Sequence, residues 1–345
     1  MNGDSLPVSA FVDYADGTFE LGASAYEKRG VALLVPAWNA KKCIQCNNCA
    51  MACPHAAIRP FALTEEEAAG APAKARIMDM KAIRVMEYYR YSLAISPMDC
   101  MGCGICAGKC PAGALTMVPR ETQLDEQVVF DYMVENVGFK RGLFSIDSIH
   151  YCQYGAPYLE FSGSCAGCAE TSYARLVTQL FGDRMLISNA TGCSSIWGGP
   201  AACSPYNVDR DGRGPAWANS LFEDNAEHGL GIHLGHNKVR NDLKPTVEWI
   251  AANARKEEVR QAAQEYLDTY DVGTANLLPS QHLVEVLEAC GPCCEAAAEV
   301  LSKKEFLSKK STWIFGGDGW AYDIGFGGLD HVLASGEDVN IFVFN

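Results

Sequence analysis

Two stretches of the chain carry cysteines in one repeated spacing, C-x2-C-x2-C-x3-C-P. The cysteines are Cys43, Cys46, Cys49 and Cys53 in the first run and Cys100, Cys103, Cys106 and Cys110 in the second. In such runs three closely spaced thiolates bind one cubane iron–sulfur cluster, and the fourth, before the proline, binds the other. The sequence therefore predicts two [4Fe–4S] clusters. One is bound by Cys43, Cys46, Cys49 and Cys110, the other by Cys100, Cys103, Cys106 and Cys53.

Zinc sites and disulfides are the alternatives for so many cysteines. A zinc site typically uses two C-x2-C pairs, which leaves the third cysteine of each run and the cysteine–proline step without a role. Disulfides need an oxidising compartment. Residues 1–7 are polar, so we expect no signal peptide. We therefore expect the 16 cysteines to serve metal binding in a reducing cytoplasm, in an anaerobe because exposed clusters are sensitive to oxygen.

Length and charge narrow the class of protein further. A chain of 345 residues suggests two or three domains, and 48% hydrophobic residues is ordinary for a globular protein. The formal net charge of −14 argues against a broad surface for nucleic acid or anionic lipid. The longest apolar runs, such as 31–35, are far too short to span a bilayer. We therefore expect neither nucleic acid nor a membrane as a partner.

Three further cysteines follow predicted strands in a part of the chain with an α/β pattern. The strand at 158–161 leads into Cys165 and Cys168, and the strand at 184–189 leads into Cys193. In a doubly wound parallel sheet both loops lie at the carboxyl edge, where ligands bind. Three thiols that converge there could hold three corners of another cluster, for which the sequence shows no obvious fourth ligand.

Two other interpretations of these cysteines stay open. Gly163–Gly167 fits G-x-C-x-G, a cysteine version of the nucleophile elbow, and a thiol at a helix N-terminus is acidified, which would indicate a thiol hydrolase. The other interpretation is buried structural cysteine. The pair Cys165 and Cys168, with Cys193 on the neighbouring loop, favours metal. Small buried side chains are expected at Cys290, Cys293 and Cys294, and no role is assigned to Cys152 or Cys203.

A glycine-rich turn after another predicted strand could bind a diphosphate. The strand at 311–315 enters Gly316-Gly317-Asp318-Gly319-Trp320. Glycines let the backbone approach a diphosphate, and the helix that follows offers its N-terminal amides. Mg²⁺ binds through one or two carboxylates together with phosphate oxygens, so Asp318 is the candidate ligand. The G-D-G turn is common by itself, and its cysteine-rich companions strengthen this interpretation.

The elements that must position these residues follow from the sequence pattern. We expect a strand at 31–36 before the first cysteine run, and an insertion at 64–90 in which Glu65–Glu67 form a solvated helical stretch. The remaining predictions are helices at 170–181 and 245–270, one or two helices within 281–301, an irregular functional segment at 197–219, and a last strand at 339–344.

The strand at 339–344 is apolar and ends with the chain, although a strand of a parallel sheet needs helices on both faces and a crossover onward. We therefore expect the chain to be a fragment. The predicted fold is an α+β two-[4Fe–4S] ferredoxin domain followed by an incomplete α/β domain with a parallel sheet. The predicted limits are 1–40 for a connecting segment from a missing upstream domain, 41–120 for the ferredoxin-type domain and 121–345 for the α/β domain.

Taken together, these motifs resemble the pyruvate:ferredoxin (flavodoxin) oxidoreductases over the whole chain. Besides the cysteine runs, the matching stretches are Ala23–Arg29 with its Ala-Tyr-Glu-Lys-Arg, Ser164–Thr171, Thr191–Gly199, Ser220–Gly229 and Gly316–Leu333. The chain looks like the middle-to-late part of that large enzyme: its two-cluster ferredoxin domain and the start of its thiamine-diphosphate domain.

The resemblance implies roles for individual residues. Cys165, Cys168 and Cys193 would bind the cluster nearest thiamine diphosphate, with the fourth ligand beyond Asn345. The cofactor would be lined by Glu170, Cys193, Gly317, Asp318, Gly319 and Trp320, with Asp318 on Mg²⁺. The family's thiamine-activating glutamate and pyruvate-binding residues lie outside this chain, so no catalytic residue is assigned.

The resemblance also implies an activity. It is the oxidative decarboxylation of pyruvate with coenzyme A to acetyl-CoA and CO₂, with electrons passing from thiamine diphosphate through [4Fe–4S] clusters to ferredoxin or flavodoxin, in a homodimer. The alternative from another class is a stand-alone ferredoxin-like electron carrier whose α/β part docks a partner. Binding of thiamine diphosphate separates the two, because a simple carrier has no reason to bind it.

Overall fold

The computed structural model describes residues 5–81, 88–140, 143, 148–200, 203–291 and 294–345. The chain divides into two compact units, each described by itself below. The first unit comprises residues 1–182 and 196–214, and the second comprises residues 183–195 and 215–345. The predicted domain limits near residues 40 and 120 stay a prediction.

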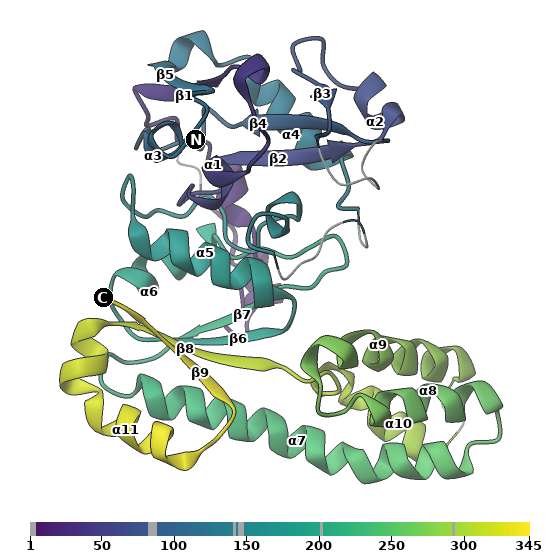
Figure 1. Ribbon diagram of the computed structural model, residues 1–345. Helices are drawn as coiled ribbons and strands as arrows, with labels where there is room; N and C mark the ends of the chain where they lie inside the picture. The colour runs from purple at the N-terminus through teal and green to yellow at the C-terminus, as the bar shows by residue number, and fades with distance from the viewer. Residues whose placement is uncertain (1–4, 82–87, 141–142, 144–147, 201–202, 292–293) are drawn as a thin grey trace. The chain divides into compact units, whose positions relative to one another are not determined.

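The first unit contains two small antiparallel sheets (Figure 1). In one, β1 (Leu34–Trp38) pairs with β5 (Leu115–Pro119), and in the other β4 (Arg90–Ile95) lies between β2 (Ile58–Leu63) and β3 (Met78–Asp79). The helices are α1 (Asn48–Met51), α2 (Glu65–Ala69), α3 (Ile105–Gly108), α4 (Glu126–Asn136) and α5 (Ala169–Phe181). The strand predicted at 31–36 begins three residues later than expected, and the helix predicted at 170–181 is confirmed as α5.

The sheet of β2 and β4 is buried on both faces, which is why all six residues of β2 are buried. One face packs with Trp38, Tyr91 and Leu93 against the cysteine runs, including Cys49 and Cys106. The other face packs against α4 through the core cluster that contains Phe61, Leu63, Ala94, Phe130 and Met133. The cysteine runs are therefore part of the core of this unit. The sheet on which they pack is covered on its other face by α4.

The predicted helix in the insertion at 64–90 is confirmed. Helix α2 begins at Glu65 because Thr64 and Glu67 form a capping box: the Thr64 hydroxyl accepts from the Glu67 amide (3.2 Å), and the Glu67 carboxylate accepts from the Thr64 amide (2.7 Å). The carboxylate of Glu67 also pairs with Lys140 at 2.6 Å. The insertion is thus fastened to the segment that follows α4.

The strand predicted at 158–161 is wrong. Leu159 forms an isolated antiparallel bridge with Tyr206, and the amide of Phe161 donates to the carbonyl of His55. Phe161 has φ of +50°, a left-handed conformation that a β-strand cannot continue through. The apolar alternation of this stretch fits the packing of Leu159 and Phe161 in the core, not strand pairing.

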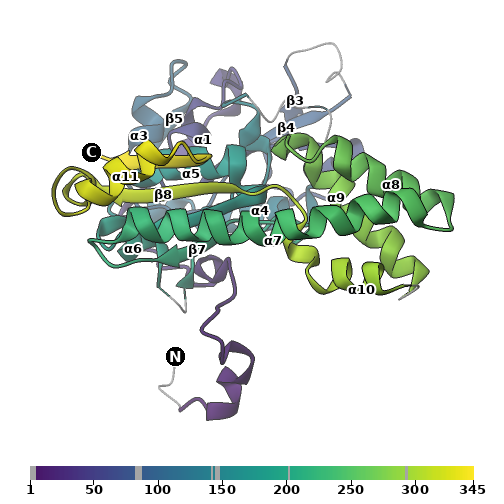
Figure 2. The ribbon, with the colours of Figure 1, turned by 90° about the horizontal axis from the view of Figure 1, so that it is seen from below.

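The second unit is built on a parallel sheet in the order β7-β6-β8-β9. The strands are β6 (Met185–Asn189), β7 (Ala216–Asn219), β8 (Ser311–Gly317) and β9 (Val339–Phe344), which confirms the strands predicted at 184–189, 311–315 and 339–344. The helices are α7 (Asn225–Asn253), α8 (Glu257–Asp268), α9 (Gly273–Cys290), α10 (Glu295–Ser302) and α11 (Phe326–Ser335), while α6 (Cys193–Gly198) crosses the boundary between the units. Helix α7 runs along β8 in the view from below (Figure 2).

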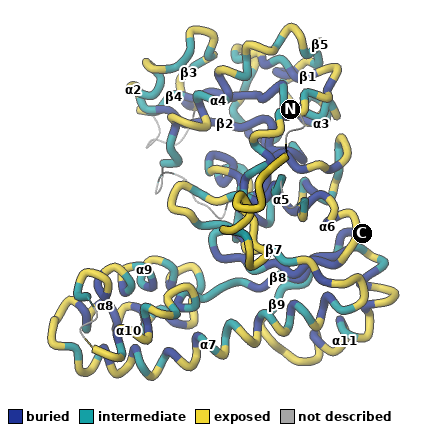
Figure 3. Tube along the Cα trace, turned by 180° about the vertical axis from the view of Figure 1, so that it is seen from behind, coloured by how far each residue is buried: buried dark blue, intermediate teal, exposed yellow. Residues whose placement is uncertain are grey.

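The single helix predicted at 245–270 is wrong, whereas the one or two helices predicted at 281–301 are confirmed as α9 and α10. Helix α7 starts twenty residues earlier, at Asn225, and ends at Asn253, where Ala254 adopts an extended conformation with ψ of 139°. The predicted apolar face is buried at Val247, Ile250 and Val259. Because α7 and α8 fold back on each other, these side chains meet in one core, which a single straight helix could not form. Figure 3 shows the outward faces of these helices exposed.

Candidate metal centres

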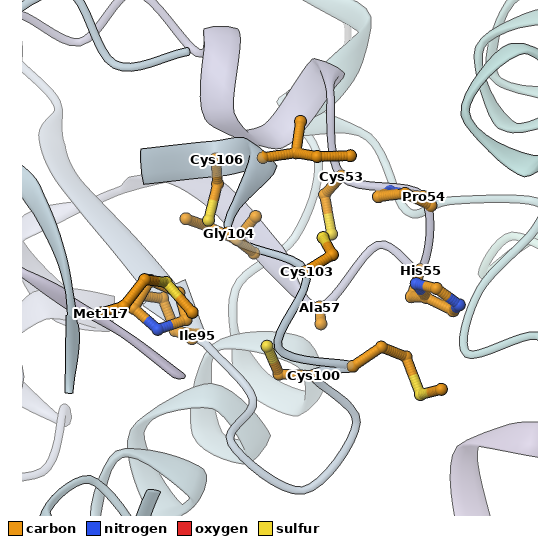
Figure 4. A pocket seen from close by; sticks show the side chains of 14 residues that line it. Cys53, Pro54, His55, Ala57, Ile95, Cys100, Cys103, Gly104, Cys106 and Met117 are labelled. Atoms are coloured by element: carbon orange, nitrogen blue, oxygen red, sulfur yellow. The ribbon is translucent and has the colours of Figure 1, made fainter. Parts of the chain in front are cut away.

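One pocket of the first unit is lined by the thiols of Cys53, Cys100, Cys103 and Cys106 (Figure 4). Their sulfur atoms are turned toward one another in the close-up, with Ile95 and Met117 among the apolar side chains around them. Three of these cysteines belong to the second run and one to the first.

The other cysteine pocket has the reciprocal composition. It is lined by Cys43, Cys46 and Cys49 of the first run and by Cys110 of the second, under the rings of Trp38 and Tyr91 and beside other apolar residues. Each pocket thus takes its fourth cysteine from the other run. This is possible because helices α1 and α3 pack against each other. Whether the two sets bind clusters stays a prediction.

Equivalent left-handed residues shape the loops of both runs. Gln45 and Asn47 have φ of 62° and 58° in the first run, and Gly102 and Gly104 have φ of 72° and 74° at the same positions of the second. This curvature turns the backbone toward the thiols. The amides of Gln45 and Gly102 each lie 3.4 Å from the sulfur of the cysteine two residues earlier. Amide donors to cluster thiolates are among the features that set the reduction potential of such clusters.

Burial raises the pKa values of three of the pocket thiols. Burial raises the pKa of Cys49 and that of Cys100 to about 12, and neighbouring thiolates add to both shifts. Burial likewise raises the pKa of Cys106, with Cys53 and Cys100 as the main neighbours. Without a bound cation these thiols therefore stay protonated at neutral pH, and metal binding must release their protons.

Each pocket has the four thiol donors that a [4Fe–4S] cluster requires. Within the described ranges, no group of three or more His, Cys, Asp or Glu side chains could hold a single metal ion. In a cubane cluster each cysteine binds a different iron, so the sulfurs stand farther apart than around one zinc ion. The assignment of one [4Fe–4S] cluster to the four cysteines of each pocket stays a prediction.

The loop of Cys165 and Cys168 lies against the second cysteine run. Cys165 is exposed and Cys168 half-buried, and the Cys168 amide donates to the Cys165 carbonyl at 3.1 Å. A Cβ on Gly167, which has φ of 78°, would be in ordinary van der Waals contact with the Cβ of Cys103, at 3.6 Å. This loop therefore borders the pocket of Cys53, Cys100, Cys103 and Cys106 within the same unit.

A buried polar network holds this loop in place. The hydroxyl of Ser164 lies 2.9 Å from Nε2 of His55 and 3.1 Å from the hydroxyl of Thr171, at the first turn of α5. His55 follows Cys53 and Pro54, and burial lowers its pKa. The network thus ties the loop of Cys165 to the end of the first cysteine run. The elbow interpretation of Gly163–Gly167 loses its preceding strand, because 158–161 is not one.

Sequence reasoning treated residues 1–40 as a connecting segment and missed the contacts of residues 28–30. The ammonium of Lys28 pairs with the buried carboxylate of Asp99 at 2.7 Å, directly before Cys100. The Gly30 amide donates to the Met98 carbonyl (2.8 Å), and Arg29 donates to the carbonyl of Ser162 (3.2 Å). The segment therefore contacts the approaches to both Cys100 and Cys165. The signal was an aspartate next to a cluster cysteine, which when buried needs a cation.

The second unit places two predicted site loops at neighbouring strand ends. Strand β6 leads toward β7 on one side and β8 leads toward β9 on the other, so the chain leaves β6 and β8 in opposite directions. Such a switch point at the carboxyl edge of a parallel sheet is where ligands bind. Cys193 follows β6, Asp318 follows β8, and both are exposed. The Ala190 amide donates to the Phe315 carbonyl at 2.8 Å, which holds the two strand ends together.

The glycine turn after β8 wraps around Trp320. A Cβ on Gly316 would lie 2.4 Å from the Trp320 ring, and one on Gly325 would lie 2.5 Å from it, so both positions require glycine. Trp320 is fully buried, and within the described residues its ring nitrogen has no hydrogen-bond partner. Gly317 and Gly319 flank the exposed Asp318, with Gly319 facing Phe222.

The remaining predicted site residues lie apart along the chain. Glu170 stands in the first turn of α5, half-buried, and its carboxylate accepts from the Trp197 ring nitrogen at 3.0 Å. Cys165, Cys168 and Glu170 belong to the first unit, whereas Cys193, Asp318 and the turn of Gly317, Gly319 and Trp320 belong to the second. Their joint role stays a prediction.

The other cysteines differ in exposure. Cys152 is buried, and Cys290 packs half-buried against the core of α7 to α10. The expectation of a buried side chain is wrong for Cys294, which is exposed just before α10, and Cys293 lies outside the described residues. Cys203 is half-buried near Glu27, whose carboxylate raises the pKa of that thiol through a hydrogen bond. Among the described helices, none has the length and apolar character needed to cross a membrane.

Comparisons with known proteins agree with the interpretation of the two cysteine runs. A family model described as a 4Fe-4S dicluster domain matches residues 42–114, and another, described as a domain of unknown function, matches residues 1–32. The chain is 50% identical over 345 residues to pyruvate-flavodoxin oxidoreductase of Klebsiella pneumoniae. The matched region covers 99% of this chain and 29% of that protein. It is 44% identical over 357 residues to pyruvate:ferredoxin oxidoreductase of Moorella thermoacetica, covering 100% and 30%.

A third relative is the mitochondrial pyruvate dehydrogenase [NADP(+)] of Euglena gracilis, 40% identical over 347 residues that make up 99% of this chain and 19% of that protein. The chain thus spans about a third or less of the length of these relatives. The resemblance that the motifs indicate is confirmed, and it extends over both units.

Proposed function

We propose that this chain, a homologue of part of the pyruvate:ferredoxin and pyruvate-flavodoxin oxidoreductases, is the electron-transfer and thiamine-diphosphate segment of such an enzyme. The observation that carries the proposal is the pair of cysteine pockets, each lined by three thiols of one run and one of the other. The relatives are named for pyruvate and for ferredoxin or flavodoxin. We extend those partners to the protein to which this chain belongs.

The proposed ligands of one [4Fe–4S] cluster are Cys43, Cys46, Cys49 and Cys110, and those of the other are Cys100, Cys103, Cys106 and Cys53. Apolar side chains line both pockets, and the amides near Cys43 and Cys100 would stabilise negative charge on the sulfurs. The chain's contribution is to hold two one-electron centres side by side in a rigid core.

A third cluster is proposed at Cys165, Cys168 and Cys193. Its support in the first unit is the contact of Gly167 with Cys103, which puts the Cys165 loop next to a proposed cluster ligand. A third centre bound by this loop would be the link that precedes the cluster of Cys100 in a chain of one-electron transfers. Glu170, in the same loop–helix junction, is proposed to line the organic cofactor.

Thiamine diphosphate and Mg²⁺ are proposed at the carboxyl edge of the second unit's sheet. When bound, thiamine diphosphate supplies the carbanion chemistry for the decarboxylation of a 2-oxo acid. The exposed carboxylate of Asp318 is suited to Mg²⁺, and Gly317 and Gly319 leave the adjoining backbone open. The buried ring of Trp320 packs under this turn. Cys193 follows the end of the neighbouring strand, β6.

The whole enzyme is proposed to convert pyruvate and coenzyme A to acetyl-CoA and CO₂, as a cytoplasmic homodimer in an anaerobe. Each pyruvate yields two electrons, which leave singly because iron–sulfur clusters and flavodoxin or ferredoxin accept one at a time. The chain's own residues bind, orient and shield the centres for these transfers.

The testing experiment measures iron, acid-labile sulfide and zinc per chain after anaerobic purification. About eight irons with equal sulfide are expected for two complete clusters, and about twelve if the third site is also filled. Little iron with stoichiometric zinc would overturn the cluster assignment. Calorimetric titration with thiamine diphosphate and Mg²⁺ then separates the proposal from the stand-alone electron carrier, for which no binding is expected.

A further inference from the structure

Arg175 on α5 is a buried arginine next to the cysteine pockets, 3% exposed. Its guanidinium donates from Nε to the carbonyl of Cys53 (2.9 Å) and from Nη2 to the carbonyls of Met51 (2.8 Å) and Ala50 (2.5 Å). These acceptors form the short stretch between Cys49, which lines one pocket, and Cys53, which lines the other. The cation is therefore fixed where the chain passes between the two pockets.

The charge of this arginine has no carboxylate to balance it. The fourth acceptor, Oε1 of Gln153 at 2.9 Å, is neutral like the carbonyls. Throughout the part of the chain that the structure describes, no carboxylate pairs with Arg175. The side chains whose charges act on it are Cys53 and Cys152, each anionic only without its proton, and the cationic Arg59. A guanidinium stays protonated in proteins, and a buried charge is costly when unpaired.

We propose that Arg175 is a positioning residue that sets the reduction potential of the clusters bound by the two cysteine runs. Each one-electron reduction adds one negative charge to a cluster, and a fixed cation beside it stabilises that product over the oxidised form. The same guanidinium holds the Ala50–Cys53 backbone, so its distance from both centres is constant. This inference rests on the cluster ligation proposed above.

A second buried arginine, which also donates to backbone carbonyls, lies away from the cysteine pockets. Arg240 on α7 is 4% exposed, donates to the carbonyl of Leu307 at 2.9 Å, and lies 3.6 Å from the ring centre of Tyr270. It belongs to the second unit and has no cysteine pocket around it. Arg240 is therefore a matched control for the purely structural effect of removing a buried arginine.

The test compares the full-length chain, loaded anaerobically, with the variants Arg175→Gln, Arg175→Lys, Gln153→Glu and Arg240→Gln. Iron is counted in each, and the cluster potentials are measured by dithionite titration followed by electron paramagnetic resonance. Gln153→Glu keeps the acceptor of the 2.9 Å bond but supplies a carboxylate that cancels the charge of Arg175. It keeps the test decisive if Arg175→Gln fails to fold.

Loss of the charge should make reduction about tenfold less favourable, a shift of ~59 mV to lower potential for one electron. We expect this shift in Arg175→Gln and Gln153→Glu, and potentials near those of the unaltered chain in Arg175→Lys and Arg240→Gln. An iron-replete Gln153→Glu or Arg175→Gln chain with unchanged potentials would overturn the inference. An unaltered chain without clusters would instead overturn the function proposed above, so the two failures are distinct.

Discussion

The cysteine pockets of the first unit and the carboxyl edge of the second unit are built in opposite ways. Each pocket draws its thiols from two runs, and most of these thiols are buried or half-buried in a core. The edge site draws Cys193 and Asp318 from loops that are far apart in sequence, and both are exposed. The first unit therefore groups four thiols around each pocket, whereas the second unit presents single exposed side chains at the edge of its sheet.

This difference separates two kinds of cofactor site. A cluster bound in the first unit would meet four thiols and apolar side chains, whereas a ligand at the second unit's edge would meet one carboxylate and a turn of backbone. Removing one thiol should therefore eliminate a whole centre, but removing the carboxylate should weaken binding by a limited factor. The predictions below test this contrast.

The largest effect is expected from Cys53→Ala. Cys53 belongs to the first run but lines the pocket of Cys100, Cys103 and Cys106. The variant should lose the cluster of the second run, about four irons per chain, and keep the cluster of the first. Iron analysis and the paramagnetic resonance spectrum of the reduced chain measure this.

The control is Cys152→Ala, a buried cysteine outside both runs, which should keep its full iron content. Loss of the first run's cluster in Cys53→Ala, with the second intact, would mean that each run binds its own four cysteines. The exchange between the runs would then be wrong.

A smaller effect is expected from Asp318→Asn. The amide keeps the size of the side chain but removes the charge that suits Mg²⁺, so the affinity for thiamine diphosphate with Mg²⁺ should fall roughly ten- to a hundredfold. Calorimetric titration measures it. The control is Asp323→Asn, which alters an exposed carboxylate of the helical segment Gly319–Ile324 that follows the turn and should bind as the unaltered chain does. Equal affinities for all three chains would remove Asp318 from the proposed site.

The two regions also differ in how far the sequence alone predicts them. The grouping of pocket thiols follows from the spacing of the two runs, because local spacing fixes which thiols can share a centre. The turn at Gly316–Trp320 was likewise placed correctly at the end of a strand, β8. What local pattern could not give was the left-handed Phe161, which ends an otherwise strand-like stretch.

Contacts between distant segments were harder to predict. The break between α7 and α8 depends on their packing against each other, since both segments have helical periodicity on either side of it. The pairing of Lys28 with Asp99 joins residues 71 apart in sequence. The helix break has no local signature, and the position of Asp99 next to Cys100 does not say which cation pairs with it, so the role of residues 28–30 emerged only from the fold.

Lys28→Met tests whether residues 28–30 stabilise the part of the first unit that leads into Cys100. The variant leaves the carboxylate of Asp99, 2% exposed, without its cation, while the half-buried position of Lys28 moderates the loss. We expect the free energy of unfolding of the first unit to fall by about 2 kcal/mol, measured by denaturant titration. Lys74→Met, which breaks the exposed pair with Asp125, should cost less than about 1 kcal/mol. Equal costs would show that the Asp99 pair is an ordinary surface contact.

The stability of the iron-free chain should depend on pH. Burial raises the pKa of Cys49 and of Cys100 from 9.0 to about 12. Between these values the folded chain keeps protons that the unfolded chain releases, so stability should fall as pH rises above 9, by about 1.4 kcal/mol per pH unit for each such thiol. Below pH 9 the two states bind these protons equally, and stability does not change through them.

Denaturant titration of the reduced, iron-free chain from pH 8 to about 10.5 measures this loss, with the double variant Cys49→Ala and Cys100→Ala as control. Other groups titrate in the same range, but they are common to both chains, so the difference in slope isolates the two thiols. With clusters bound these cysteines are thiolates at every pH, and their part of the slope should vanish. An equal slope in the iron-free chain and the double variant would mean that the thiols are not desolvated, and that the first unit is as open as the edge site of the second.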